Sequence, residues 1–245
     1  MRTVKLVIAF QGTHYDGWQS QRTGKTLQEI FEKQLARILT EKTHLTSSSR
    51  TDSGVHARGL VAHFKTKSTL TDTKLQAALN YYLPEDVLVL SAKTVTNDFH
   101  ARYHAKSKTY EYLIWNSRTR PIYDLASYCL WHGGAMNINK MRKAARLLVG
   151  KHDFSAFRDS GDDEKDPVRT IYSILIRKTG SKVSIRVRGN GFLRHMVRIL
   201  AGTLIQAGRG KATPESVQTA LLSKNRKLSG PTSKALGLTL LKVQY

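Results

Sequence analysis

Residues 171–188 of this chain read IYSILIRKTGSKVSIRVR, two strand-like runs on either side of a short polar turn. Both runs, 171–177 and 182–188, are rich in β-branched residues, and Thr179, Gly180 and Ser181 supply the turn. The spacing predicts an antiparallel hairpin, because parallel neighbours need a crossover connection of about a dozen residues or more. The hairpin argues against an all-parallel sheet.

Outward from this hairpin, strand and helix signals mix along both halves of the chain. Strands are expected at 3–10, 61–66, 87–96, 109–115 and 236–243. Helices are expected from a Thr26–Glu29 capping box to about residue 39, over 72–82, from Asn137 to 148, over 191–207 and from Thr213 to 222. Residues 47–58 are expected to be a loop. The pattern predicts an α+β fold in two domains, 1–104 and 105–245.

The charge of the chain is large and unevenly placed. Its 245 residues include 40 Lys and Arg against 18 Asp and Glu, a formal net charge of +22. Residues 167–245 carry 15 of the basic residues and one acid, Glu215. Such one-sidedness indicates a polyanionic partner, most often a nucleic acid, with an anionic membrane surface as the alternative.

Other features of the composition narrow the class of protein. Hydrophobic residues make up 40% of the chain, enough to build a core. The chain contains no apolar run long enough to span a membrane. The single cysteine, Cys129, excludes a disulfide framework and a cysteine-based zinc cage, fits a reducing cytosol, and is expected to be a small buried residue.

Two segments of the second half place cations together. In the strand at 182–188 the alternation puts Val183, Ile185 and Val187 on one face and Lys182, Arg186 and Arg188 on the other. In the helix expected over 191–207, Arg194 and Arg198 stand four residues apart on one face, where like charges repel. This pairing predicts a nearby anion, either phosphate or a protein carboxylate.

A loop in the first half carries the clearest chemical signal. Residues 50–57 read RTDSGVHA, with Asp52 between Arg50 and Arg58. An aspartate in a loop rich in Ser and Gly is usually a turn residue. However, a neighbouring guanidinium favours the ionised carboxylate, and an ionised, oriented aspartate serves as a nucleophile or a general base.

Five strings extend this signal over nearly the whole chain, and with them the chain resembles the tRNA pseudouridine synthase A family. Residues 49–57, SRTDSGVHA, are similar to the family's GRTDxGVHA loop. The other four strings also match the family, and all five keep the family's order along the chain. They are YDGWQSQ at 15–21, FHAR at 99–102, KTYEY at 108–112 and GFLRHMVR at 191–198.

The resemblance implies a fold, a reaction and a set of roles. The fold would have two α+β domains, each a mixed, mostly antiparallel sheet with helices on one face, with a basic cleft between them. The enzyme would be a cytoplasmic homodimer that isomerises uridine to pseudouridine at positions 38, 39 and 40 in the tRNA anticodon arm. By match, Asp52 is the nucleophile, Tyr110 stacks on the target uracil and Arg198 pairs with Asp52. Residues expected to bind RNA are Arg50, Arg58, Arg102, Arg186, Arg188 and Arg194.

The implied reaction needs no cofactor, because isomerisation neither oxidises nor hydrolyses its substrate. No metal and no membrane partner are expected. The carboxylate can add to C6 of the uracil or to C1′ of the ribose, and the sequence does not choose between them.

This chain departs from the family pattern at three places. Ser49 stands where the family has glycine, and Lys234 and Leu236 replace a proline and a histidine near the C-terminal end. These departures leave the selection of uridines open and would fit a divergent second copy of the enzyme. The alternative function is an RNA-binding module or RNA chaperone without catalysis, against which the intact set of Asp52, Tyr110 and Arg198 argues.

Three weaker patterns are set aside. Gly24, Lys25 and Thr26 imitate part of a phosphate-binding loop but lack its first glycine, since position 19 is Gln19. His100 and His104 have a spacing suited to zinc but no obvious third ligand. The five acids within 159–166 are best interpreted as a solvated loop.

Overall fold

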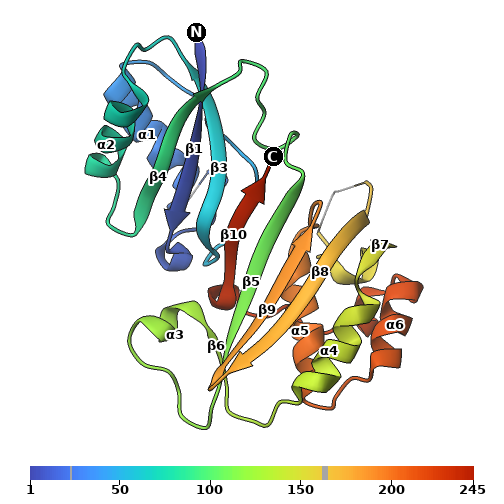
Figure 1. Ribbon diagram of the computed structural model, residues 1–245. Helices are drawn as coiled ribbons and strands as arrows, with labels where there is room; N and C mark the ends of the chain where they lie inside the picture. The colour runs from blue at the N-terminus through green and yellow to red at the C-terminus, as the bar shows by residue number, and fades with distance from the viewer. Residues whose placement is uncertain (23, 162–164) are drawn as a thin grey trace. The chain divides into compact units, whose positions relative to one another are not determined.

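The computed structural model describes residues 1–22, 24–161 and 165–245, which divide into two compact units (Figure 1). The first unit consists of Met1–Lys106 and Thr239–Tyr245, and the second of Ser107–Leu238. The domain boundary expected between residues 104 and 105 stays a prediction. Part of the acidic stretch at 159–166, namely residues 162–164, lies outside the described residues, as does Thr23.

The first unit is built on a mixed sheet. Strand β1 pairs antiparallel with β3 and β4, β2 pairs antiparallel with β3, and β10 pairs parallel with β3. Alternate residues of β1, among them Leu6 and Ile8, are fully buried, as the period of a half-buried strand requires. Helix α2 packs against β4 and against α1. The elements are β1 (Arg2–Phe10), η1 (Gly12–His14), α1 (Leu27–Leu39), β2 (Thr46–Ser47), β3 (His56–Thr66), α2 (Asp72–Tyr82), β4 (Val87–Val95) and β10 (Leu238–Gln244).

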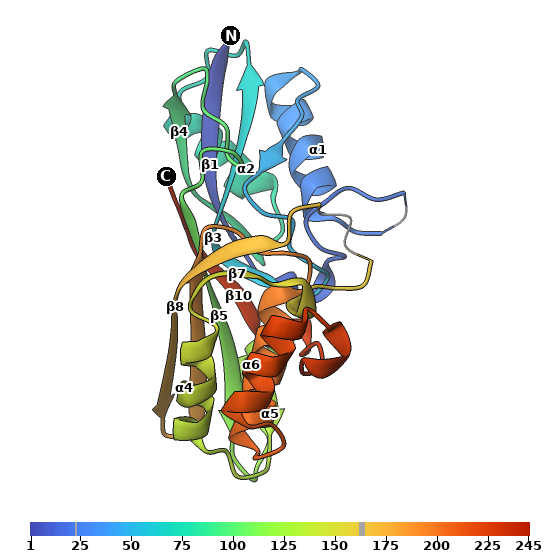
Figure 2. The same ribbon diagram turned by 90° about the vertical axis from the view of Figure 1, so that its right-hand side faces the viewer.

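The second unit has an antiparallel sheet in the order β5-β9-β8-β7, with β6 added parallel to β5. Helices α4, α5 and α6 lie on the same side of this sheet (Figure 2). The elements are β5 (Ser107–Asn116), α3 (Asp124–Tyr128), β6 (Leu130–His132), α4 (Ile138–Leu147), β7 (Gly150–Asp153), η2 (Ser155–Phe157), β8 (Val168–Thr179), β9 (Lys182–Gly189), α5 (Met196–Gly208), α6 (Pro214–Ser223), η3 (Arg226–Leu228) and η4 (Ala235–Gly237).

The predicted α+β class and the hairpin are confirmed. Strands β8 and β9 pair antiparallel up to Thr179 and Lys182, so the turn lies where the sequence indicated it. Along β9, Val183, Ile185 and Val187 are fully buried while the residues between them are more exposed. Two helix starts are confirmed by their caps: Asn137 accepts a hydrogen bond from the Lys140 amide (3.0 Å), and Thr213 accepts one from the Ser216 amide (3.2 Å). Cys129 is buried, as expected.

Three local predictions were wrong. The helix expected over 191–207 begins only at Met196, because His195 adopts a left-handed conformation (φ 57°) that interrupts the helical path. Strand β3 begins at His56, inside the expected loop, because its first residues pair with β10. The Thr26 side chain makes no capping hydrogen bond, and the Glu29 carboxylate instead accepts one from the Ser20 hydroxyl (2.5 Å).

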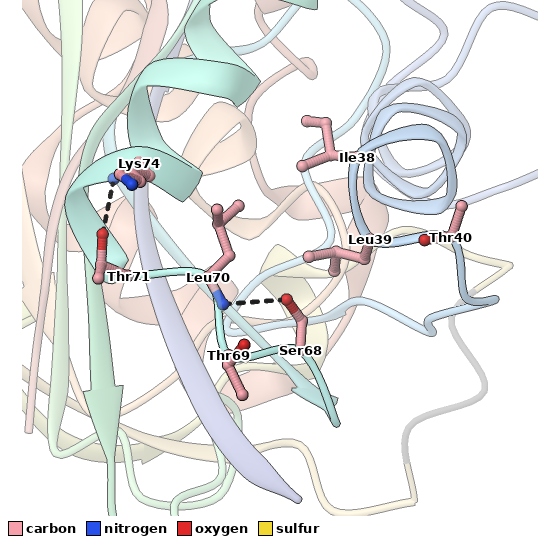
Figure 3. Close-up of a pocket in the computed structure, with 8 residues that line it drawn as sticks. All are labelled: Ile38, Leu39, Thr40, Ser68, Thr69, Leu70, Thr71 and Lys74. Carbon is pink, nitrogen blue, oxygen red and sulfur yellow. Dashed lines mark hydrogen bonds between the residues drawn. The ribbon is translucent and has the colours of Figure 1, made fainter.

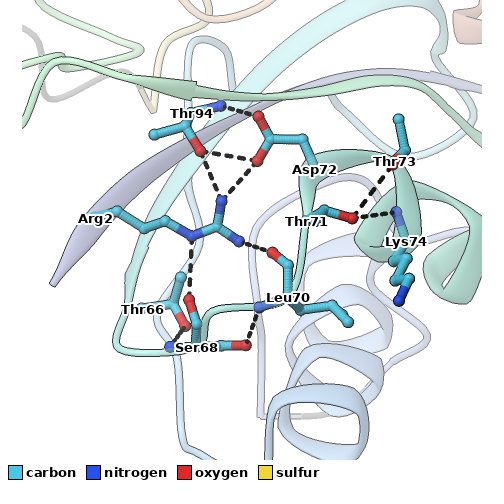
Figure 4. A network of polar contacts seen from close by, with 9 residues as sticks. All are labelled: Arg2, Thr66, Ser68, Leu70, Thr71, Asp72, Thr73, Lys74 and Thr94. Atoms are coloured by element: carbon cyan, nitrogen blue, oxygen red, sulfur yellow. Dashed lines mark hydrogen bonds and ion pairs between the residues drawn. The ribbon is translucent and has the colours of Figure 1, made fainter.

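A polar network at the start of the chain ties β1, β4 and α2 together (Figure 4). The Arg2 guanidinium reaches Asp72 Oδ1 and the Thr94 hydroxyl at 2.7 Å each, and it also donates to the Leu70 carbonyl. Burial raises the pKa of the Asp72 carboxyl, but hydrogen bonds from Thr94 and the ion pair with Arg2 outweigh burial and hold this pKa below its ordinary value.

Asp72→Asn is expected to lower the free energy of unfolding by about 1–3 kcal/mol at pH 7, because charge-assisted bonds are lost. A carboxyl whose pKa is depressed in the folded state stabilises the fold at pH values above its ordinary pKa, near 4. It loses this contribution as the pH falls through the pKa of the folded state. Urea unfolding should therefore show a gap between wild type and Asp72→Asn that shrinks at acidic pH. The exposed Glu85→Gln is the control, and an equal gap at both pH values would contradict the prediction.

Candidate functional site

Asp52 lies half-buried on the connection between β2 and β3. Its carbonyl accepts a hydrogen bond from the Val55 amide (3.2 Å), and Gly54 takes a positive φ of 77°, so residues 51–55 close a tight turn. We refer to these residues as the Asp52 turn. The turn places Asp52 immediately before a strand anchored in the sheet.

A second stretch of backbone, residues 15–18, holds the Asp52 turn and is called the brace. The Tyr15 carbonyl accepts from the Gly54 amide (3.3 Å) and from the Ser53 hydroxyl (3.2 Å). The Trp18 amide donates to the Thr51 carbonyl (3.0 Å). Two of the strings that carry the family resemblance, 15–21 and 49–57, are therefore bound to each other.

The side chain of Tyr15 fixes the brace to Asp86, the residue before β4. Its ring is buried, and its hydroxyl donates to the Asp86 carboxylate at the start of β4. Burial, and then the neighbouring Asp86 charge, raise the pKa of the Tyr15 phenol, so the hydroxyl stays protonated and remains a donor. Sequence reasoning missed this contact, because nothing near residue 15 indicates a partner at residue 86.

The brace approaches so closely that only glycine fits at position 17. Gly17 has a φ of 90°, and a Cβ there would stand 2.6 Å from the Thr51 carbonyl oxygen. Within the described residues, the buried hydroxyls of Ser49 and Thr51 have no hydrogen-bond partner.

Tyr110 and Arg198 belong to the second unit. Tyr110 lies on β5, is 8% exposed, and meets the edge of the Phe192 ring at a centroid distance of 5.2 Å. This contact joins two further resemblance strings, 108–112 and 191–198. Asp52 belongs to the first unit, so its pairing with Arg198 stays a prediction.

Arg198 on α5 is held by a segment near the C-terminal end. Its Nε donates to the Ser233 carbonyl (2.8 Å), and its own carbonyl accepts from the Ser233 amide (3.1 Å). The buried Tyr112 hydroxyl donates to the Lys234 carbonyl (2.8 Å). A Cβ on Gly202 would stand 1.8 Å from the Pro231 carbonyl oxygen, so the segment lies directly on α5. Position 234, one of the departures from the family pattern, thus lies in the segment that holds Arg198.

Three of the arginines expected to bind RNA have protein partners in the second unit. Arg186 Nε lies 2.8 Å from Glu111 Oε1, and the Arg188 guanidinium lies over the Tyr172 ring, 5.2 Å from its centroid. Arg194 precedes α5, so the prediction that it shares a helix face with Arg198 was wrong. Its Nε lies 3.3 Å from Asp159 Oδ2, so the expected anion near Arg194 is a protein carboxylate. In the first unit Arg50, Arg58 and Arg102 are exposed.

The first unit also has a surface hollow. A cavity of about 390 Å³ opens between the end of α1 and the start of α2 (Figure 3). It is lined by Ile38, Leu39, Thr40, Ser68, Thr69, Leu70, Thr71 and Lys74, none of which the sequence indicated as functional. In the described part of the chain, no group of three or more His, Cys, Asp or Glu is placed to hold a metal ion, and no helix is long and apolar enough to cross a membrane.

Comparison with known proteins decides the family. A family model described as tRNA pseudouridine synthase matches residues 6–104 and 144–245. The chain belongs to this family. It is thus an enzyme of the pseudouridine synthase class, an isomerase, and the resemblance stated from its motifs is confirmed.

Relatives match along their full length. The chain is 43% identical to a tRNA pseudouridine synthase A of Thermoanaerobacter sp. (strain X514), covering 100% of both proteins. It is 45% identical to one of Syntrophotalea carbinolica, covering 100% of this chain and 97% of that protein. It is 41% identical to a protein of Clostridium perfringens named tRNA pseudouridine synthase A 2, again over 100% of both.

The similarity to one solved structure is more distant. A chain of the archaeal box H/ACA sRNP Nop10-Cbf5 complex matches with a TM-score of 0.36 and 13% identity, over 94% of this chain and 61% of that one. This similarity is too low to bear on the site.

Gly17→Ala is expected to loosen the Asp52 turn of this pseudouridine synthase. The variant combines a positive φ with a clash against the Thr51 carbonyl, and should lower the free energy of unfolding by about 2–4 kcal/mol. Hydrogen exchange at the Gly54 amide should become faster. The control is Gly180→Ala, which also has a positive φ (56°) but no atom within 4 Å of its Cβ. Equal losses in both variants would show that the close contact contributes nothing.

Proposed function

We propose that this chain converts uridine to pseudouridine in the anticodon arm of tRNA, at positions 38, 39 and 40, with Asp52 as the nucleophile. The observation that carries the proposal is the position of Asp52: it lies within the matched region 6–104, half-buried, on a turn held by the brace. A carboxylate fixed in this way is preorganised for attack. It is therefore a more effective nucleophile than a carboxylate on a mobile side chain.

The chemistry needs only atoms that the substrate already has. The bond between C1′ and N1 breaks, a bond between C1′ and C5 forms, C5 loses a proton and N1 gains one. Two routes satisfy this balance: the Asp52 carboxylate could add to C6 of the uracil, or it could add to C1′ of the ribose. The detached uracil has to be held while it turns, which is the role proposed for the Tyr110 ring.

Arg198 is proposed to pair with Asp52 and keep its carboxylate oriented. Its contacts with Ser233 support a fixed guanidinium rather than a mobile one. Since Lys234 and Leu236 depart from the family pattern beside this anchor, we propose that they influence which uridines are selected.

The grip on tRNA is proposed to come from Arg50, Arg58, Arg102, Arg186, Arg188 and Arg194, which would contact phosphates. We also propose that the enzyme works in the cytoplasm as a homodimer. Light scattering that gives the mass of one chain would refute the homodimer.

Asp52→Asn is expected to abolish pseudouridine formation while tRNA binding stays within about twofold of wild type, because the amide is isosteric but not nucleophilic. The assay is single-turnover conversion of a tRNA transcript, read by mapping pseudouridine in the product. Glu85→Gln, an exposed carboxylate elsewhere in the first unit, should convert at the normal rate.

The two functions weighed from the sequence separate in this experiment. If the Asp52→Asn variant still formed pseudouridine, Asp52 would not be the nucleophile. A wild type that binds tRNA but forms no pseudouridine would support the RNA-binding module instead.

Arg58→Ala is expected to weaken tRNA binding and to reduce the slope of log Kd against log salt by about 1, as loss of one phosphate contact does. Arg186→Ala should do less, because its guanidinium is already 2.8 Å from Glu111. Titrations of binding at several salt concentrations measure both slopes. A larger change for Arg186 than for Arg58 would contradict this ranking.

A further inference from the structure

Three rings in the first unit contact one another in series, the first pair tilted at 60° and the second pair stacked, and the last ring is exposed to solvent. His63 of β3 is buried in the sheet, and its ring centroid lies 4.9 Å from that of His100. The His100 ring is stacked on Tyr103, with centroids 4.2 Å apart and planes at 28°. Tyr103 is 74% exposed. We call His63, His100 and Tyr103 the ring stack.

The backbone holds the ring stack rigid. The Nδ1 atom of His63 accepts from the Ala101 amide (3.2 Å). The Nδ1 atom of His100 accepts from the amides of Arg102 and Tyr103, both at 3.2 Å. A ring nitrogen that accepts carries no proton, so these contacts fit neutral imidazoles. Burial first, and then neighbouring positive groups, lower the pKa of His63 and of His100, which favours the same neutral state.

A second layer of rings supports the stack from the side. Phe99 meets the edge of His63 at 5.8 Å and packs on Tyr245 at 5.0 Å. The Tyr245 hydroxyl donates to the Ala101 carbonyl (2.7 Å). The exposed Tyr103 therefore stands on a fixed base, and little side-chain freedom is lost when a flat ligand lands on it.

The surroundings of the ring stack are basic. The Arg102 guanidinium lies 5.8 Å from the Tyr103 ring centroid, and Lys5 Nζ lies 5.7 Å from that of Phe99. Lys93 stands opposite Lys5 in the pairing of β1 with β4. Asp98 is an acid in the same segment; a hydrogen bond from the Thr96 side chain lowers its carboxyl pKa, so it stays negatively charged among these cations. A flat ligand with negative charge beside it fits these groups, and an unpaired nucleotide has both features.

We infer that Tyr103, with Arg102 beside it, is a stacking platform for an unpaired base of the RNA substrate. The inference rests on the proposed function for the identity of the RNA. A base stacked on an aromatic side chain gains about 1–3 kcal/mol, and cation–π contact with an arginine adds to it. The phosphate next to the stacked base would meet the cations around the ring stack.

The test compares Tyr103→Phe, Tyr103→Leu and Tyr103→Ala in binding to a tRNA transcript, measured by fluorescence anisotropy. Phenylalanine keeps the ring, so its Kd should stay within about twofold of wild type. Leucine and alanine lose the π-face and should raise Kd by about 5- to 150-fold, the equivalent of one stacked base. Tyr81→Ala is the matched control, because Tyr81 is also an exposed tyrosine (81%) of the same unit, packed edge-on against Tyr82.

Either of two results would overturn the inference: Tyr103→Leu binding as tightly as wild type, or Tyr103→Phe losing as much affinity as Tyr103→Ala. Pseudouridine formation is measured in the same samples to keep the two proposals apart. Normal binding by Tyr103→Leu with conversion by wild type refutes the platform alone. Absence of conversion by wild type refutes the proposed function, while the Kd series still decides the platform.

Discussion

The direct contact of one backbone segment with another is what the proposed active site depends on. The brace at residues 15–18 touches the Asp52 turn through three hydrogen bonds and leaves no room for a Cβ at Gly17. Backbone contacts of this kind do not adjust by rotating a side chain, so the position of Asp52 follows the position of the brace. The brace is in turn tied to β4 through Tyr15 and Asp86. A reactive group on a loop thereby gains the rigidity of the sheet.

The second unit uses the same principle with different parts. Arg198 lies on α5, and its guanidinium and its carbonyl both form hydrogen bonds with the backbone of Ser233. Gly202 lets this segment lie against α5, and Tyr112 fixes the neighbouring residue from the sheet. In both units, backbone hydrogen bonds therefore help to position residues proposed for chemistry, Asp52 in the first unit and Arg198 in the second. The departure at Lys234 fits this arrangement, since its carbonyl rather than its side chain accepts the hydrogen bond from Tyr112.

Local patterns in the sequence predicted much of the fold, and long-range contacts explain what they missed. The hairpin of β8 and β9 and the helix starts at Asn137 and Thr213 depend on residues a few positions apart, so they could be read directly. The start of α5 could not, because a left-handed conformation such as that of His195 is uncommon for any non-glycine residue and leaves no periodic signal. The candidate site divides in the same way: Asp52, Tyr110 and Arg198 were predicted through motif resemblance, and their roles stay predictions. The contact of Tyr15 with Asp86 and that of Arg194 with Asp159 join distant positions and leave no periodic signal.

Strand β10 gives the first unit an unusual dependence on the order of synthesis. This strand lies beside β3, with Thr239 opposite His56, and the Lys106 amide donates to the Gln244 carbonyl. The sheet that supports the Asp52 turn therefore stays incomplete while the whole second unit is being translated, and closing it requires a long loop with its entropic cost. During that interval the edge of β3 is open to pairing with other strands. The Asp52 turn thus acquires its final support only after β10 has been synthesised and has paired with β3.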